Sequence, residues 1–544
     1  MLVDVAYGLL GAGMIILAAL VARRVGLPAP VLLVAVSILY AVLPGPNITL
    51  DSEVVLVLVL PPLLYSAALN SSLTGIRANL RTVISLSVLM IIATALLTGY
   101  LLAAVVPGLS FAAACALGAA LAPMDPVSAL SIGRRLGLPE RLRTVIEGES
   151  LLNDATALTV YTVAVAALVG GGFDVPSVLG RFVLALAGGI AFGLAVAWIV
   201  GLIRRRLEEP VVETTLSLAT PFLAYLPAEA SHSSGVLAVV VAGLVLGHRS
   251  RRLQSGPARL HAVAVWHLVD LLLEGFVFLL IGQQLPAVLH NIQKYPVSTV
   301  VTATTVTIAS IVLLRPLWLL LPTLLPVRLR ILSPHPNLDG RELTALSWTG
   351  MRGVISLAAV FALPPSAGSA PFPHHDLLLF CAYVTVLVTL VGQGLTFGPL
   401  LRWLGLRPDL GEDQRLRARA RIAAADAGLR ALESLQNRES VPEDIVERLR
   451  NIADIRRRRS EDILAALAVD TTASPAAESA SAVFGHVRRT MIEAERDELL
   501  LWRDTGNLPD SSLRLLENEL DREEGALPPP VPRPPRHAET APQS

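Results

Sequence analysis

Long apolar segments alternate with short polar ones over the first three quarters of the chain. Thirteen of them have about the length that a helix needs to cross the hydrocarbon core of a bilayer. They lie near residues 5–22, 30–44, 53–69, 82–106, 109–133, 144–170, 176–203, 211–228, 234–248, 263–285, 296–325, 343–364 and 377–402. Because lipid offers no partners to backbone amides and carbonyls, each segment should be helical. The pattern therefore predicts an all-α polytopic membrane protein with about 13 transmembrane helices.

The pattern changes after the last apolar segment. Residues 1–405 form the predicted membrane domain, and residues 406–526 are rich in charge with helical periodicity, which predicts an α-helical cytoplasmic tail. The end of the chain, residues 527–544, is rich in proline, and we expect it to be disordered.

Composition supports a membrane protein and excludes other classes. Of the 544 residues, 53% are hydrophobic and only 16% are charged, whereas soluble proteins carry roughly a quarter charged residues. The formal net charge is zero, so no basic excess indicates nucleic acid. The only cysteines, Cys115 and Cys381, lie inside apolar segments and predict neither a disulfide framework nor a cysteine metal site. We find no nucleophile–base pair or metal cluster, so we expect neither an enzyme nor a cofactor.

Arginine placement predicts the orientation in the membrane. The loop arginines, from Arg23 to Arg341, fall in alternate loops, whereas the intervening loops hold little beyond Lys294 and Arg181. The positive-inside rule then places the N-terminus outside and the C-terminus in the cytoplasm, in a multi-pass protein of the cell (inner) membrane. The first segment has the alternative of a cleaved signal peptide, but Asp4 precedes it and arginines follow it, which favours a retained span.

Two of the segments are interrupted near their middles. The fifth contains Pro123-Met124-Asp125-Pro126, and the twelfth contains Thr349-Gly350-Met351-Arg352-Gly353. They are seven segments apart, so they cross the membrane in opposite directions. Paired broken helices in inverted halves indicate the midplane site of a secondary transporter.

Each break carries one charged residue. Asp125 precedes a proline suited to the first position of a helix, so it is a candidate N-cap facing a positive helix end. Arg352 lies between glycines, where freed carbonyls would form a negative pole for a guanidinium. The alternatives are a plain proline kink with an incidental cap, and an Arg352 side chain that extends to the membrane surface.

The sixth segment holds the most unusual polar residues. Carboxylates inside a span cost roughly 2.5–3.5 kcal/mol or more each, so Glu149 and Asp154 are candidates for an ion or proton site. Glu149 and Asn153 share one helical stripe, and Ser150 and Asp154 share the next. Arg315 of the eleventh segment is the available partner for Glu149, which leaves Asp154 to bind Na⁺, another monovalent cation or H⁺. The alternative is that these residues only connect helices through hydrogen bonds.

A single titrating carboxylate has a consequence for transport. If Asp154 takes either a cation or a proton, both loaded states carry the same charge, and one-for-one exchange is electroneutral. The alternatives to such an exchanger are a cation-coupled solute symporter on a similar inverted repeat, and a channel. A symporter would need a roomier polar cavity than these few residues predict.

At these residues the chain resembles the NhaP/NHE-type sodium/proton exchangers. The matching segments are Gly148-Glu149-Ser150-Leu151-Leu152-Asn153-Asp154, Asp125-Pro126-Val127, Phe278-Leu279-Leu280-Ile281-Gly282, Met351-Arg352-Gly353-Val354-Ile355-Ser356-Leu357-Ala358 and Gln393-Gly394-Leu395-Thr396. The resemblance implies exchange of Na⁺, or of Li⁺ or K⁺, for H⁺ in pH and sodium homeostasis, and a homodimer with a fixed dimerisation domain and a moving core domain.

The resemblance also assigns roles to residues. It implies that Asp154 binds the transported Na⁺ or H⁺ with Asn153 and Ser150 nearby, that Glu149 pairs with Arg315, and that Arg352 lies in the second broken helix.

The chain departs from the family pattern at two positions. Met124 replaces a frequent threonine, and Ser66 replaces a frequent acidic residue, so the cation selectivity and the pH range of activity stay open. Among other acidic residues, we expect Glu213, Glu229 and Asp270 at membrane ends and Glu274 deeper.

Overall fold

The computed structural model describes residues 2–25, 29–42, 55–136, 138–169, 175–207, 209–324, 338–363, 366–367, 370–372, 374–406, 410–438, 441–469, 475–505, 508, 510–525 and 527. Its internal contacts divide the chain into two units, Met1–Pro408 and Asp409–Ser544. The sequence places the corresponding boundary between residues 405 and 406.

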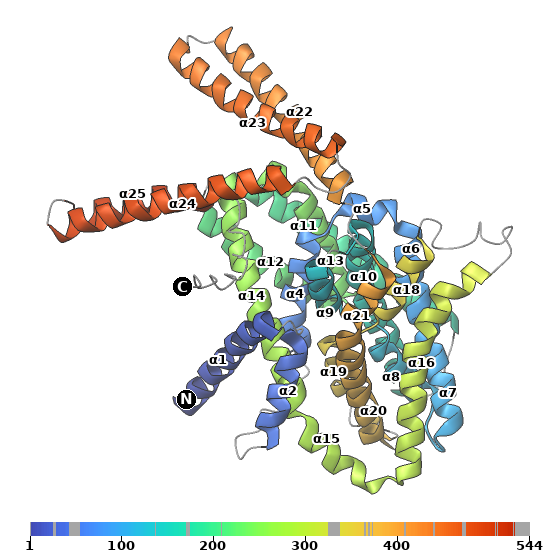
Figure 1. The fold of residues 1–544 in the computed structure, drawn as a ribbon. Coiled ribbons are helices and arrows are strands. Elements are labelled where there is room, and N and C mark those ends of the chain that lie inside the picture. The colour runs from blue at the N-terminus through green and yellow to red at the C-terminus, as the bar shows by residue number, and fades with distance from the viewer. Residues whose placement is uncertain are drawn as a thin grey trace, which may run out of the picture. The chain divides into compact units, whose positions relative to one another are not determined.

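The first unit, Met1–Pro408, is called the membrane unit, and it is built almost entirely from helices (Figure 1). Its first half contains α1 (Leu2–Val25), α2 (Ala29–Val42), η1 (Val55–Val59), α4 (Leu60–Asn70), α5 (Leu73–Ala78), α6 (Leu80–Ile84), η2 (Ser85–Leu89), α7 (Met90–Val105), α8 (Phe111–Leu121), α9 (Pro126–Leu136) and α10 (Glu140–Val169). The segments η1 and η2 are π-helical turns that continue directly into α4 and α7.

The second half of the unit contains α11 (Val175–Arg204), α12 (Pro210–Ala230), α13 (Gly235–Leu253), α14 (Gly256–Gln283), α15 (Leu285–Asn291), the 3₁₀ turn η3 (Ile292–Lys294), α16 (Val297–Leu324), α18 (Gly340–Trp348), α19 (Val354–Phe361), α20 (His375–Leu387), the π-helical turn η4 (Val388–Gln393) and α21 (Gly394–Leu404). Two short strands, β1 (Ser366–Ala367) and β2 (Ala370–Pro371), pair antiparallel between α19 and α20.

Every predicted apolar segment is helical over the residues that the structure describes, apart from the two breaks, so the all-α class is confirmed. Six helical stretches in the described part are long and apolar enough to cross a membrane: Leu80–Val105, Glu140–Leu168, Val183–Arg204, Gly256–Lys294, Val297–Leu320 and His375–Leu404. Further apolar helices of 10–17 residues accompany them. The total of thirteen crossings stays a prediction.

Both predicted breaks are present. The first separates α8 from α9, which begins at Pro126 as expected for a proline at the first helical position. The second separates α18 from α19, and Gly353 precedes α19 in an extended conformation. Figure 1 shows α9, α10, α18 and α21 in the middle of the unit. The helices that follow the first break and precede the second, α9 and α18, both contact α10 and α21.

Glycine allows several of these helices to approach closely. A Cβ atom on Gly118 of α8 would lie 2.9 Å from the carbonyl oxygen of Ala95 in α7. A Cβ atom on Gly247 of α13 would lie 2.4 Å from the carbonyl oxygen of Leu69 in α4. Membrane helices associate mainly through such close contacts, because lipid is as apolar as their side chains.

The tail unit contains α22 (Leu410–Gln436), α23 (Glu443–Val469), α24 (Pro475–Asp504) and α25 (Asp510–Gly525). Within this unit α22 packs on α23, and α24 packs on α25. The predicted proline-rich end lies outside the described residues, apart from residue 527.

Candidate functional site

The two broken helices touch where each is interrupted. The backbone N–H of Asp125 donates a hydrogen bond to the carbonyl of Met351, with an N–O distance of 2.8 Å. A Cβ atom on Gly353 would lie only 2.6 Å from Asp125 Cβ. Glycine is therefore required for this approach, and residues more than 200 positions apart meet at one point.

The charges at this crossing complement the half-helix ends. Asp125 lies directly before α9 and against Gly353, which precedes α19, so the positive ends of two half-helices face its carboxylate. The Arg352 guanidinium donates to the carbonyl of Ala122, at the C-terminal end of α8, over 2.5 Å. Arg352 is 2% exposed, so its side chain does not extend to the membrane surface. The Arg352 side chain instead points inward and donates a hydrogen bond to a backbone carbonyl of the first broken helix.

Glu149 and Arg315 form a bidentate ion pair. Arg315 Nη1 and Nη2 lie 2.5 and 2.8 Å from the two carboxylate oxygens, and the side chains are 2% and 0% exposed. Arg315 Nε also donates to the carbonyl of Leu346 over 2.9 Å, and Nη2 donates to Thr349 Oγ1 over 3.1 Å. The pair therefore connects α10, α16 and the end of α18 before the second break.

Asp154 has a different environment on the same helix. It lies at the midpoint of α10 and is 3% exposed. The neighbouring side chain, Asn153, donates to the carbonyl of Met124 in the first break over 3.3 Å. Asp125 is close enough to Asp154 for their charges to repel. Within the described residues no ion pair is found for Asp154, in contrast to Glu149.

Oxygen atoms for a small cation are available around Asp154. Asn153 Oδ1 is buried and accepts no hydrogen bond from any residue that the structure describes, and Ser150 is buried one turn before Asp154 on α10. No group of three or more His, Cys, Asp or Glu side chains suited to a bound metal occurs among the described residues.

Sequence reasoning named Thr349 and Gln393 only as members of motifs, without a role, and did not name Thr389. Thr349 accepts a hydrogen bond from Arg315, and its Oγ1 lies 3.9 Å from Met124 Sδ. Thr389 in the π-helical turn η4 accepts from the backbone N–H of Arg352 over 3.1 Å. Gln393, also in η4, has a buried Oε1 without a hydrogen bond. The π-helical turn itself is the structural signal, because such turns are frequent at functional sites.

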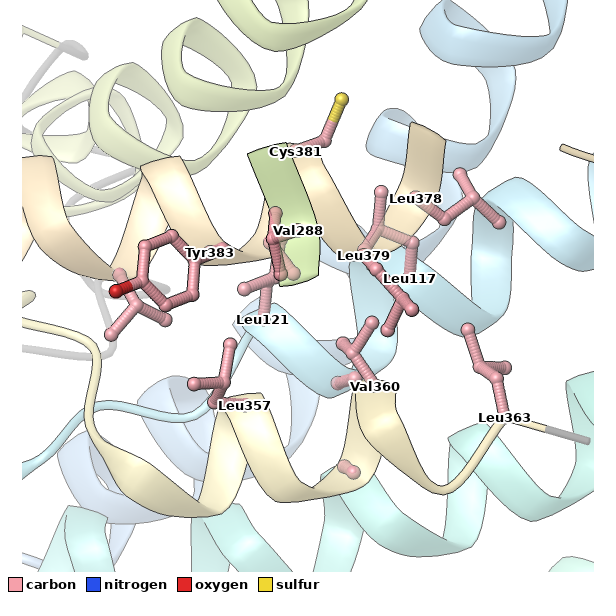
Figure 2. Packing of buried hydrophobic residues seen from close by; sticks show 14 of the residues in the cluster. Leu117, Leu121, Val288, Leu357, Val360, Leu363, Leu378, Leu379, Cys381 and Tyr383 are labelled. Carbon is pink, nitrogen blue, oxygen red and sulfur yellow. The ribbon is translucent and has the colours of Figure 1, made fainter. Parts of the chain in front are cut away.

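Apolar packing closes the bundle beside the crossing. Leu117 and Leu121 of α8 contact a cluster that includes Leu357 and Val360 of α19. Figure 2 shows α19 and α20 facing each other across this cluster, with the α8 side chains between them. Apolar side chains of α8, α19 and α20 therefore pack beside the ends of both breaks.

Comparison with known families gives one match over most of the chain. The model of the family described as "Sodium/hydrogen exchanger, transmembrane" matches residues 12–403. An uncharacterized Na⁺/H⁺ exchanger of Mycobacterium tuberculosis is 34% identical over 535 residues, which cover 95% of this chain and 96% of the relative.

Two further proteins are similar over part of the chain. A sodium, potassium, lithium and rubidium/H⁺ antiporter of Bacillus pumilus is 30% identical over 380 residues, 67% of this chain and 56% of the relative. The solved structure of the sodium proton antiporter MjNhaP1 from Methanocaldococcus jannaschii covers 74% of this chain and 99% of its own, with a TM-score of 0.60 at 21% identity. This likeness establishes a shared fold.

Proposed function

Because the chain belongs to the sodium/hydrogen exchanger family, we propose that Asp154 is the group at which its exchanged ions bind. The chain is a multi-pass membrane protein that exchanges a monovalent cation for protons. The solute symporter expected as the alternative is not favoured.

One observation carries the proposal. Two carboxylates lie five residues apart on α10, and only Glu149 has a cationic partner among the described residues. Asp154 therefore needs either a bound cation or a proton to neutralise its charge at this depth. Asn153 and Ser150 supply oxygen atoms to the cation, and Glu149–Arg315 keeps the helices in place throughout the cycle.

The stoichiometry follows from the charges at the crossing. Asp125 faces two helix N-termini that stabilise its negative charge, so Asp154 is the carboxylate that changes its occupancy. One cation replaces one proton there, and the exchange is electroneutral. Membranes loaded with the protein should give no steady exchange current, and a current that follows the Na⁺ gradient would contradict this stoichiometry.

We further propose Na⁺ as the principal cation, with Li⁺ and K⁺ as competitors. The relative from Bacillus pumilus is named for sodium, potassium, lithium and rubidium. Met124 supports a broad selectivity, because the residue before Asp125 offers a thioether, which lies 3.9 Å from Thr349 Oγ1, in place of a hydroxyl that could act as a hard oxygen ligand.

The cellular setting is part of the same proposal. The protein acts in the cell membrane as a homodimer, with its N-terminus outside and its C-terminal tail in the cytoplasm. It serves pH and sodium homeostasis, and it transports ions without covalent chemistry. The alternation of arginine-rich loops supports this orientation.

The test uses everted vesicles with a trapped pH dye and a preformed proton gradient. Adding Na⁺ should dissipate the gradient in vesicles with the parent protein, and Asp154→Asn should abolish the response. Glu140→Gln is the matched control, since this carboxylate on the same helix is 70% exposed. A normal Na⁺ response from Asp154→Asn would refute the assignment.

A further inference from the structure

A second carboxylate lies at the midpoint of a long membrane helix. Asp270 occupies the middle of α14, as Asp154 occupies the middle of α10. Ser66 Oγ of α4 donates a hydrogen bond to Asp270 Oδ2 over 2.7 Å. The other oxygen, Oδ1, is buried and has no hydrogen-bond partner in the described part of the chain.

The surroundings of Asp270 leave its charge uncompensated. No ion pair to Asp270 occurs among the residues that the structure describes, and the electrostatic neighbour on its own helix, His267, is exposed. Ser66 is 1% exposed and neutral. The Tyr65 and Trp266 rings, which precede Ser66 by one residue and Asp270 by one turn on their helices, pack with centroids 5.4 Å apart, and Trp266 Nε1 donates to Ser217 Oγ. A carboxylate with one oxygen buried and unpartnered among the described residues is stabilised by a positive partner.

This pair is separate from the site at the crossing. Helix α4 packs against both α10 and α14 and so connects these two helices. Leu64 and Tyr65 of α4, Leu151 and Ala155 of α10, and Trp266 of α14 belong to one apolar cluster. Asp270 is therefore one helix away from the helix of Asp154.

We propose that Asp270 and Ser66 form a second binding site, for the cation that the protein exchanges. The two carboxylate oxygens and the serine hydroxyl are the hard oxygen ligands that a partly dehydrated alkali cation takes. The site holds the ion before it reaches Asp154 and raises its local concentration there, which lowers the apparent KM. This inference rests on the proposed exchange at Asp154.

The first test separates charge from hydrogen bonding. Asp270→Asn keeps an acceptor for Ser66 Oγ but removes the charge. The apparent KM for Na⁺ should rise by about fivefold or more, the effect of one unit charge at moderate distance inside a protein. The maximal rate should stay within about twofold of the parent, since this charge acts before the ion reaches Asp154. Glu140→Gln, exposed at the start of α10, is the control and should leave both quantities unchanged.

The second test moves the carboxylate across the contact. In Ser66→Asp/Asp270→Ser the hydroxyl and the carboxylate exchange helices and remain in reach of each other. The double variant should recover a KM close to that of the parent, because the charge is restored. Asp270→Ser alone should keep the high KM of Asp270→Asn.

The outcomes distinguish this inference from the proposed function. If Asp154→Asn is inactive and Asp270→Asn has the parent KM, the second site is refuted while the exchange site stands. If Asp270→Asn lowers the maximal rate at an unchanged KM, and the double variant does not recover, Asp270 has a structural role and the second site is refuted. If Asp154→Asn exchanges normally, the proposed function fails first.

Discussion

The membrane unit and the tail unit use the same arginine–carboxylate chemistry in opposite environments. In the membrane unit, Glu149 and Arg315 are 0% and 2% exposed and form a bidentate pair. In the tail, Arg488 bridges α24 to Glu523 of α25, and these side chains are 20% and 49% exposed. Both pairs join helices, but only the first is sealed from solvent by its neighbours.

The difference teaches what an ion pair does in each setting. A buried pair adds little net stability, but removing one partner leaves a charge without compensation, at a cost of about 3–5 kcal/mol. An exposed pair is replaced by water when one partner is lost. The membrane unit therefore depends on each charge being in its place, whereas the tail hairpin tolerates their loss.

We expect the largest loss of stability when the buried ion pair is broken at Arg315. Arg315→Leu leaves Glu149 buried without its partner, so the folded protein should lose roughly 3–5 kcal/mol. Thermal unfolding in detergent measures the loss, with Arg341→Leu as the control, because Arg341 is exposed at the start of α18. In Glu149→Gln/Arg315→Leu the uncompensated charge is absent, so part of the stability should return. Equal losses in the single and double variants would contradict the role of the charge.

A second prediction tests the crossing itself. Gly353→Ala places a Cβ atom 2.6 Å from Asp125 Cβ, so the two breaks must separate. We expect a cost in the range of about 1–3 kcal/mol and a loss of Na⁺-driven proton movement, measured in everted vesicles. Gly392→Ala is the matched control in η4, since no atom lies within 4 Å of its added Cβ. Normal activity of Gly353→Ala would show that the breaks do not need this contact.

A third prediction concerns a neutral contact at the same depth. Thr389→Val removes the acceptor for the buried backbone N–H of Arg352, with an expected cost of about 1–3 kcal/mol. Thr385→Val serves as the control one turn earlier, because Thr385 Oγ1 donates to the carbonyl of Cys381 in its own helix. Thermal unfolding of the two variants should differ, and equal unfolding temperatures would argue against a role for the Arg352 contact.

The smallest effect should come from the tail. The Arg488 guanidinium lowers the pKa of Glu523 below its ordinary value, by a hydrogen bond and by charge. A lowered folded-state pKa contributes stability above the ordinary glutamate pKa and loses it as the pH falls through the folded value. Arg488→Ala should therefore speed hydrogen exchange of α24 and α25 slightly near neutral pH and have no effect in acid, with Na⁺ exchange unchanged. An effect that grows in acid would reverse the sign and contradict the pair.

Much of the membrane unit could be predicted because lipid restricts the sequence so strongly. Breaks at Pro126 and Gly353 show as helix-breaking residues inside apolar segments, and each buried charge needs a partner or a function. That restriction led from Glu149 to Arg315 and left Asp154 as the candidate.

Other contacts could not be predicted, since they depend on how separate helices meet. Arg352 satisfies a carbonyl of α8, which lies 230 residues earlier in the chain. Buried threonines usually donate to their own helix, as Thr389 also does, so the sequence gives no sign of its second contact. The pairing of Ser66 with Asp270 joins two residues 204 positions apart on different helices.

The π-helical turn η4 has a consequence for how this chain tolerates insertions and deletions. A π-helical turn contains one residue more than an α-helical turn, so deleting one residue from Val388–Gln393 would let a regular helix form. Side chains beyond the deletion would keep nearly their present direction, because a π-helical turn and an α-helical turn each complete about one revolution. The widened turn that carries Thr389 and Gln393 would be lost, although the shortened span would still be apolar and long enough for the bilayer.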